Sequence, residues 1–257
     1  DYARVSKEAP EVAEGIKEHY FPLNADSETA KSIEGQVVGI ADKMDTICAV
    51  FVSGKKPTGS SDPLGVRRAA LGIIKTVLEH NLKLDLSKLI DETLELLPVK
   101  ADVKKDVEEF FVQRLIIFLN SDYSKNILEA CSSVNPCFDL SDYLERVKAI
   151  SGGVDEKLIE NANRVLRILK EDSKKSVNKA LFKEPAESML LSQIETVSEN
   201  ADYDKYLKQL EEINPSVEKF FNDVLVMDKC ENVKENRLAL LTLLKSKYTH
   251  IADFSKL

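Results

Sequence analysis

Apolar residues recur at intervals of three and four along most of the chain, which is the pattern of amphipathic helices. The pattern is clearest between 32 and 52, where one helix face would be buried. That face carries Val37, Ile40, Ala41, Met44, Ile47, Cys48 and Phe51. Alternation of apolar and polar residues, which is typical of half-buried strands, is nearly absent. The pattern predicts an all-α fold.

Helix start and stop signals divide the rest of the pattern into elements. Asp62 followed by Pro63 is a strong start, because the carboxylate accepts free amide hydrogens and proline fits the first helical position. Asn214 and Pro215 interrupt a later helix. Helices are expected at 9–20, 32–52, 63–79, 85–97, 110–119, 123–130, 139–147, 158–179, 186–197, 203–226 and 232–248.

A polar stretch divides the chain into two helical domains. Residues 100–106 are mostly charged and follow Pro98, and a new apolar pattern begins directly after them. The predicted domains are therefore 1–102 and 103–257.

Composition limits the class of protein. No apolar run approaches the roughly 20 residues that span a bilayer, and the first residues do not form a signal peptide, so we expect a cytoplasmic protein without a membrane segment. The missing initial Met suggests a piece of a longer chain. Four cysteines without a CxxC pair indicate reduced thiols and no structural zinc.

The distribution of charge is more informative than its total. The net charge of −8 argues against a general nucleic-acid coat. Between 164 and 183, however, seven Lys and Arg stand against only Glu171 and Asp172. On the predicted helix 158–179 these cations would form an arc opposite the apolar stripe. A phosphate backbone would relieve their repulsion, and a solvated helix face is the alternative interpretation.

The first domain holds a weaker candidate site. His19, Asp42 and Asp45 suggest metal chemistry of the kind used by HD-type phosphohydrolases, but none of the three His is followed by Asp. A structural cluster is the favoured interpretation, and neither a metal nor a catalytic residue is predicted. Arg67 and Arg68 would contact RNA or pair with Asp42, Asp45 or Asp62.

The run ADKMDTICAVFVSGKKPTGSSDPLGVRRAALGII closely resembles a signature of the β subunit of bacterial glycyl-tRNA synthetase. Similarity to that family continues in EVAEGIKEHYFP, FFVQRLIIFL, LSDYLERVKAI, ANRVLRIL, FFNDVLVM, NRLALL and IADFSKL, so it covers essentially the whole chain. The chain departs from the family pattern at Gln113, Asn222 and Lys234.

The resemblance implies a C-terminal piece of that subunit, with the end of an HD-like helical domain at 1–102. A helical-bundle anticodon-binding domain similar to that of arginyl-tRNA synthetase would follow at 103–257. Its role would be to hold tRNA(Gly) by the anticodon arm for ATP-dependent glycylation at the partner α subunit. An α/β hetero-oligomer is implied, and ATP and Mg would be used by the α subunit, so no cofactor is expected in this piece.

The resemblance and the basic arc together give the candidate residues. The expected RNA contacts are Asn163, Arg164, Arg167, Lys174, Lys175 and Lys179, with Asn236 and Arg237 as a second set. The HD-like structural cluster would hold His19, Asp42, Asp45, Arg67 and Arg68, supporting the tRNA body or the subunit interface. Neither DNA nor a membrane is an expected partner. Two other classes stay open, a metal phosphohydrolase fragment and a helical protein-interaction module without RNA affinity.

Overall fold

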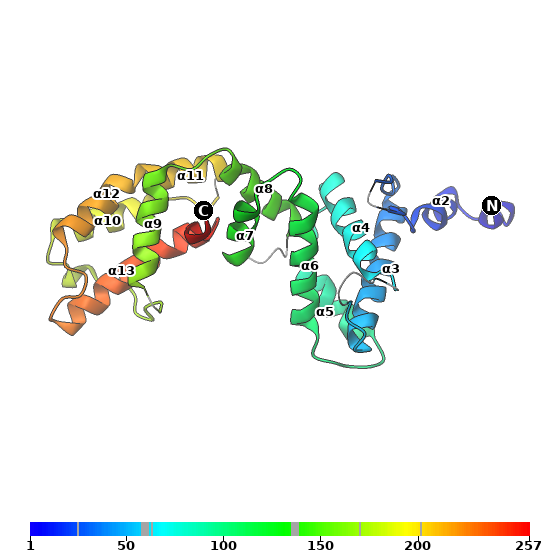
Figure 1. Ribbon diagram of the computed structural model, residues 1–257, viewed down its shortest axis with the longest axis horizontal. Coiled ribbons are helices and arrows are strands. Elements are labelled where there is room, and N and C mark those ends of the chain that lie inside the picture. The colour runs from blue at the N-terminus through cyan, green and yellow to red at the C-terminus, as the bar shows by residue number, and fades with distance from the viewer. Residues whose placement is uncertain (25, 58–61, 63, 135–138, 170, 201) are drawn as a thin grey trace. The chain divides into compact units, whose positions relative to one another are not determined.

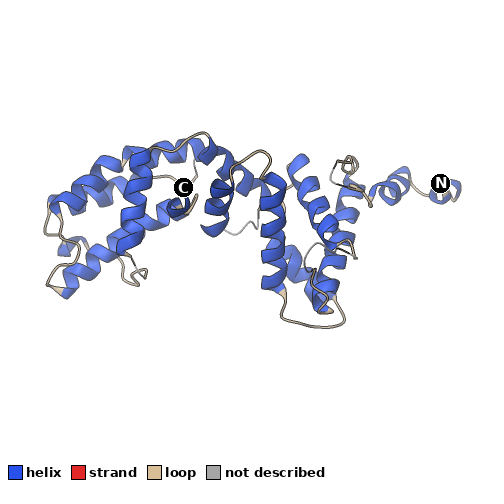
Figure 2. Ribbon diagram, in the orientation of Figure 1, coloured by secondary structure: helices blue, strands red, loops and turns tan. Residues whose placement is uncertain are grey.

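The computed structural model describes the whole chain except residues 25, 58–61, 63, 135–138, 170 and 201 (Figure 1). Its regular structure is helical (Figure 2), and the described residues contain no strand beyond an isolated bridge between Asp85 and Asp139. The prediction of an all-α fold is confirmed. No helix in the described part of the chain is long and apolar enough to cross a membrane.

Contacts divide the chain into two compact units. Among described residues the first comprises 1–122 and 139–143, and the second comprises 123–134 and 144–257. The first unit therefore includes the helix that follows residue 103. The boundary predicted between 102 and 103 stays a prediction about domains, because a compact unit and a domain need not coincide.

The first unit is built around one long helix. Its helices are α1 (Tyr2–Val5), α2 (Pro10–Glu18), α3 (Ile33–Val52), α4 (Val66–Glu79), α5 (Leu86–Leu96) and α6 (Lys104–Leu119). Helix α3 contacts α2, α4, α5 and α6. The predicted face of α3 is confirmed in its second half, where Met44, Ile47, Cys48 and Phe51 are buried. In its first half Val37 and Ala41 are exposed and Ile40 is half-buried, so burial was wrongly predicted there.

The second unit packs around its last long helix. Its elements are α7 (Lys125–Val134), α9 (Glu156–Ile168), η1 (Lys179–Leu181), α10 (Pro185–Thr196), α11 (Tyr203–Glu212), α12 (Asn214–Asp223), α13 (Glu231–Thr249) and η2 (Phe254–Lys256). Helix α8 (Leu140–Ser151) has residues in both units. Helix α13 contacts α9, α10 and η1. The predicted break at Asn214 separates α11 from α12, as expected.

Two helix starts show how local chemistry defines α3 and α4. The Ser32 hydroxyl accepts a hydrogen bond from Gly35 N at 3.1 Å, and the Glu18 carboxylate accepts from Ser32 N at 2.8 Å. The Asp62 carboxylate accepts from Arg67 N and Arg68 N, as its role at a helix start predicts. Helix α4 nevertheless begins at Val66, later than predicted, and Pro63 lies outside the described residues.

The predicted helix 158–179 is wrong in its second half. Helix α9 ends at Ile168, and the described residues between it and η1, which begins at Lys179, are not helical. The reason is long-range hydrogen bonding. Ser173 N donates to the Thr242 hydroxyl at 3.0 Å, and Asn178 N donates to the Asn236 side chain at 2.7 Å. These bonds to α13 replace the bonds that a continued helix would make.

Helices α2 and α3 approach each other closely because glycines line their contact. An added Cβ at Gly39 would lie 2.7 Å from the carbonyl oxygen of His19, and one at Gly35 would lie 2.6 Å from Glu18 Cβ. At Gly15 the nearest atom, Glu34 Cβ, would be 3.2 Å away. Larger residues at these positions would force the helices apart.

We predict that Gly39→Ala destabilises the first unit. The better helix propensity of alanine gains about 1 kcal/mol, but the clash with a main-chain oxygen should cost about 1–3 kcal/mol more than that gain. Urea denaturation followed by circular dichroism measures the change. Gly15→Ala, whose contact is a longer one with a side chain, should be tolerated better, and equal effects of the two changes would contradict this account.

Candidate nucleic-acid interface

An open groove in the second unit lies between the segment 168–175 and the first half of α13. Its apolar lining comes from Ile168, Met227 and Leu238, of which Met227 is 52% exposed. Its charged lining is formed by Glu171, Asp172, Lys174, Lys175, Lys234 and Glu235. The groove thus places cations beside exposed apolar surface, although its described lining has no aromatic side chain of the kind on which unpaired bases usually stack.

Two of the groove's cations have no counter-charge within the described residues. Asp172 is paired with Lys245 at 2.7 Å, and Lys234 with Glu231 at 3.0 Å. Lys174 and Lys175 are exposed and form no ion pair with any described residue. They are therefore the groove cations most available to an anion.

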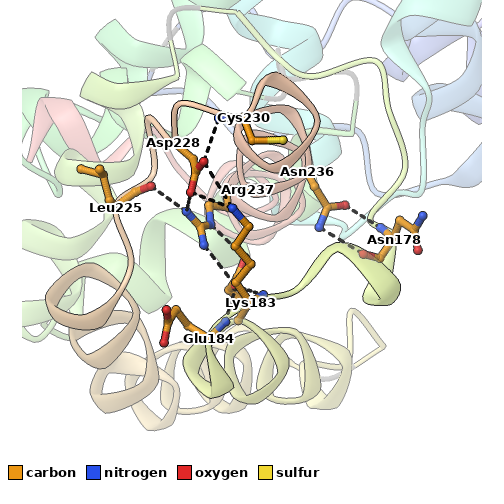
Figure 3. Close-up of polar contacts among 9 residues, drawn as sticks. Asn178, Lys183, Glu184, Leu225, Asp228, Cys230, Asn236 and Arg237 are labelled. Carbon is orange, nitrogen blue, oxygen red and sulfur yellow. Dashed lines mark hydrogen bonds and ion pairs between the residues drawn. The ribbon is translucent and has the colours of Figure 1, made fainter.

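The segment that carries these lysines is attached to α13 through its main chain. Besides the bonds to Ser173 N and Asn178 N, Asn236 donates from Nδ2 to the Asn178 carbonyl at 3.1 Å (Figure 3). The Asn178 side chain in turn accepts from Ala180 N at the start of η1. The path of the segment is thus set by bonds that do not involve the lysine side chains.

The predicted contacts on α9 differ in how available they are. The Arg164 guanidinium stacks over the Phe221 ring at 4.2 Å and donates to the Phe221 carbonyl at 3.5 Å. Arg167 is exposed, whereas Asn163 is half-buried. Lys179 is exposed and lies 3.5 Å from Glu195. Of the six residues in the first predicted set, Arg167, Lys174 and Lys175 are the least engaged.

The second predicted set lies inside the unit. Asn236 and Arg237 are each only 3% exposed, and both make their hydrogen bonds to neighbouring protein groups. As RNA contacts they stay untested predictions. Their hydrogen bonds join α13 to the segment before η1 and to α10, which is the geometry of residues that hold the interface in place.

Arg237 is the centre of a buried ionic network that joins three parts of the unit (Figure 3). Its Nε donates to Glu187 Oε1 at 3.0 Å, linking α13 to α10. Its Nη1 donates to Asp228 Oδ2 at 3.0 Å and to the Leu225 carbonyl at 2.9 Å, which holds the segment between α12 and α13. Met227, at the edge of the groove, belongs to that segment.

Glu187 is fully buried and serves two roles. Its Oε2 accepts from Lys183 N at 2.7 Å and from Glu184 N at 2.8 Å, which caps the start of α10. Burial alone would raise the pKa of Glu187, but the hydrogen bonds from Arg237, Glu184 and Lys183 together lower it. The carboxylate is therefore charged in the folded protein and paired with Arg237.

The residues predicted as an HD-like cluster come from the end of α2, from α3 and from the start of α4. Nδ1 of His19 lies 2.7 Å from the Ile16 carbonyl oxygen, and its ring packs on Tyr20. Asp42 and Asp45 are exposed on α3. Arg67 and Arg68 lie at the start of α4, and Arg68 Nε is 3.9 Å from Asp62.

This arrangement bears on the metal hypothesis. No group of three or more His, Cys, Asp or Glu among the described residues is arranged to hold a metal ion. Of the three ion-pair partners considered for the two arginines, the structure places Asp62 beside them.

Sequence reasoning missed Phe221, Met227, Glu187 and Asp228 as parts of the interface. Phe221 reads as an ordinary core residue in the apolar patch before 226, and Glu187 as an exposed helical acid. One signal was available. Glu187 is the third residue of a helix that begins with Pro185, which is where a capping carboxylate is expected.

Comparison with known families agrees with this geometry. The model of the glycyl-tRNA synthetase beta subunit matches residues 1–133, which is more than half of the chain. The chain belongs to the glycyl-tRNA synthetase beta subunit family. A second model, the DALR anticodon binding domain, matches residues 144–248, and these include the groove, α9 and the Arg237 network.

Individual relatives of this family align with the whole chain. It is 37% identical to the glycine–tRNA ligase beta subunit of Geobacter sp. (strain M21) and 38% identical to that of Geobacter metallireducens. It is 33% identical to the corresponding subunit of Coxiella burnetii. In each case the alignment covers 100% of this chain but 40% of the relative, so the chain spans about two fifths of the length of these curated beta subunits.

We predict that Arg237→Met strongly destabilises the second unit. The change leaves Glu187 buried without its cation, and breaking one side of a buried pair costs about 3–5 kcal/mol. Urea denaturation measures the free energy of unfolding. Lys208→Met on exposed α11 removes the same charge without a described partner and should stay within about 0.5 kcal/mol of the parent. A small effect of Arg237→Met would show that the network does not stabilise the unit.

The same network predicts a dependence of stability on pH. Because folding lowers the pKa of Glu187, its charged form stabilises the protein above the usual glutamate pKa of about 4.3, and this contribution is lost as the pH falls through the lowered value. The stability difference between the parent and Glu187→Gln should therefore be greatest near neutral pH and shrink below about pH 4. A constant difference from pH 7 to 3 would contradict the assignment.

Proposed function

We propose that this chain is the tRNA-binding part of a glycyl-tRNA synthetase beta subunit, and that its second unit binds the anticodon arm of tRNA(Gly). One observation carries the proposal. Arg167, Lys174 and Lys175 are exposed cations, and the two lysines line a groove with an exposed apolar residue, Met227. All lie within the residues that match an anticodon binding domain.

The chemistry of the groove suits an unpaired stretch of RNA. Lys174 and Lys175 would neutralise phosphates and release counterions, which supplies affinity that depends on salt. Ile168, Met227 and Leu238 offer an apolar surface on which a base can lie. Glu171, Asp172 and Glu235 in the same groove limit how many phosphates it accommodates. The site therefore favours a short, splayed loop over a long duplex.

The proposed contribution of this chain to the reaction is to position the tRNA. Holding the anticodon arm would place the acceptor end of the tRNA at an active site on the alpha subunit, where binding energy is converted into correct orientation. ATP and Mg would be used there, in an alpha/beta hetero-oligomer in the cytoplasm. The relatives' names describe them as beta subunits of a glycine–tRNA ligase, which supports this division of labour.

We predict that reversing two exposed charges of the second unit, one on α9 and one in the groove, weakens RNA binding. Arg167→Glu combined with Lys175→Glu should raise the Kd for a glycine-tRNA anticodon stem-loop at least about tenfold, or 1.4 kcal/mol. The slope of log K against log salt should fall by about two if each cation contacts one phosphate. Fluorescence anisotropy at two salt concentrations measures both quantities.

A matched control distinguishes an effect of these two positions from an effect of the net charge of the chain. Lys148→Glu combined with Lys208→Glu changes the net charge by the same amount at exposed positions on α8 and α11. This control should bind nearly as well as the parent. An equal loss of affinity in both double variants would mean that net charge, and not this site, controls RNA binding. If the parent chain does not bind the stem-loop, RNA binding by this part of the subunit is contradicted.

A further inference from the structure

Several exposed apolar residues of the first unit lie together on α2 and α3. A groove between these helices is lined by Val12, Gly15, Ile16, His19 and Val38, with Glu11 and Glu34 at its edges. Val12 is 46% exposed, Ile16 57% and Val38 49%. Tyr20, Ile33 and Val37 on or next to the same helices are exposed by more than half. The groove is therefore almost wholly apolar and open.

The glycine contacts explain why these side chains point outward. Gly15, Gly35 and Gly39 allow the backbones of the two helices to approach closely. Large apolar side chains are therefore not needed to fill the contact between α2 and α3. Val12 and Ile16 lie one turn apart on α2 and are left on the outer surface. An apolar groove between two helices is a common binding site for the apolar face of another helix.

The charge around the groove is acidic. Glu11 and Glu34 flank it, and Glu8 lies in an adjoining hollow that Glu11, Glu34 and one cation, Arg4, also line. Glu8, Glu11 and Glu34 form no ion pair with a described residue. Glu14 is the exception, because it pairs with Arg4 at 3.2 Å and Lys17 at 2.8 Å.

Asp42 and Asp45 extend the acidic surface along α3. Both are exposed, and neither forms an ion pair with a described residue. Residues 34, 38, 42 and 45 recur at helical spacing, so the apolar groove and the acidic surface are continuous. This charge would repel a phosphate backbone, and it would equally repel a second copy of the same face.

We propose that the α2–α3 groove docks an amphipathic helix of a partner protein, with an apolar stripe for the groove and basic residues on both sides of it. Val12, Ile16 and Val38 receive the stripe, and Glu11 and Glu34 pair with the flanking cations. The helical span from Val12 to Glu18 is about 9 Å long, which about two turns of the partner would cover. The proposal is independent of RNA binding by the second unit.

The test uses two labelled peptides with the same leucine stripe. One carries lysine on both flanks, and the other carries glutamate at the same positions. Fluorescence anisotropy with the complete chain should show saturable binding of the lysine peptide and at least tenfold weaker binding of the glutamate peptide. Glu11→Lys combined with Glu34→Lys should reverse this order.

A second pair of variants tests the location. Ile16→Asp should weaken the lysine peptide at least tenfold while the circular dichroism spectrum and RNA binding stay unchanged. Ile117→Asp on α6 is the matched control, because Ile117 is also 57% exposed, and it should have no effect. The proposal is overturned if neither peptide binds, if both bind equally, if Ile16→Asp leaves binding intact, or if the free chain dimerises through this face.

Discussion

The buried charge of Arg237 is the constraint on which the candidate interface depends. A guanidinium that is 3% exposed must be neutralised within the protein, and the partners that do so come from different elements. Glu187 brings in the start of α10, and Asp228 and Leu225 bring in the segment that carries Met227. The position of the groove's apolar edge thus follows from satisfying one cation.

The acidic total charge of the chain conceals a separation of functions. Uncompensated cations lie beside the groove of the second unit, and uncompensated carboxylates lie beside the apolar groove of the first. Each unit therefore carries charged groups suited to a different kind of partner, one anionic and one cationic.

The sequence predicted the fold class and most helices because periodicity is a local signal. The helices around 32–52, 186–197 and 232–248 appear within a few residues of their expected bounds. The segment 169–178 was mispredicted because bonds from Thr242 and Asn236, far along the chain, decide its path. Periodicity contains no information about such partners.

The candidate site was only partly predictable for the same reason. Lys174 and Lys175 are recognisable from local charge alone, and the structure leaves them exposed. Arg237 looks like another surface cation in the sequence, yet its carboxylate partner is fifty positions away. The phenyl ring beneath Arg164 is likewise invisible to a reading of α9, since Phe221 lies on α12. Burial of a charge is decided by tertiary contacts.

The attachment of the segment 169–178 has an evolutionary consequence. Thr242 and Asn236 form hydrogen bonds with main-chain groups of the segment, and every residue except proline provides such groups. The side chains at 174 and 175 can therefore change without altering the path of the segment. Substitutions there alter what the groove attracts while costing the fold little. The fold and the binding preference of the groove can then evolve separately, and the preference can change without a prior stabilising mutation.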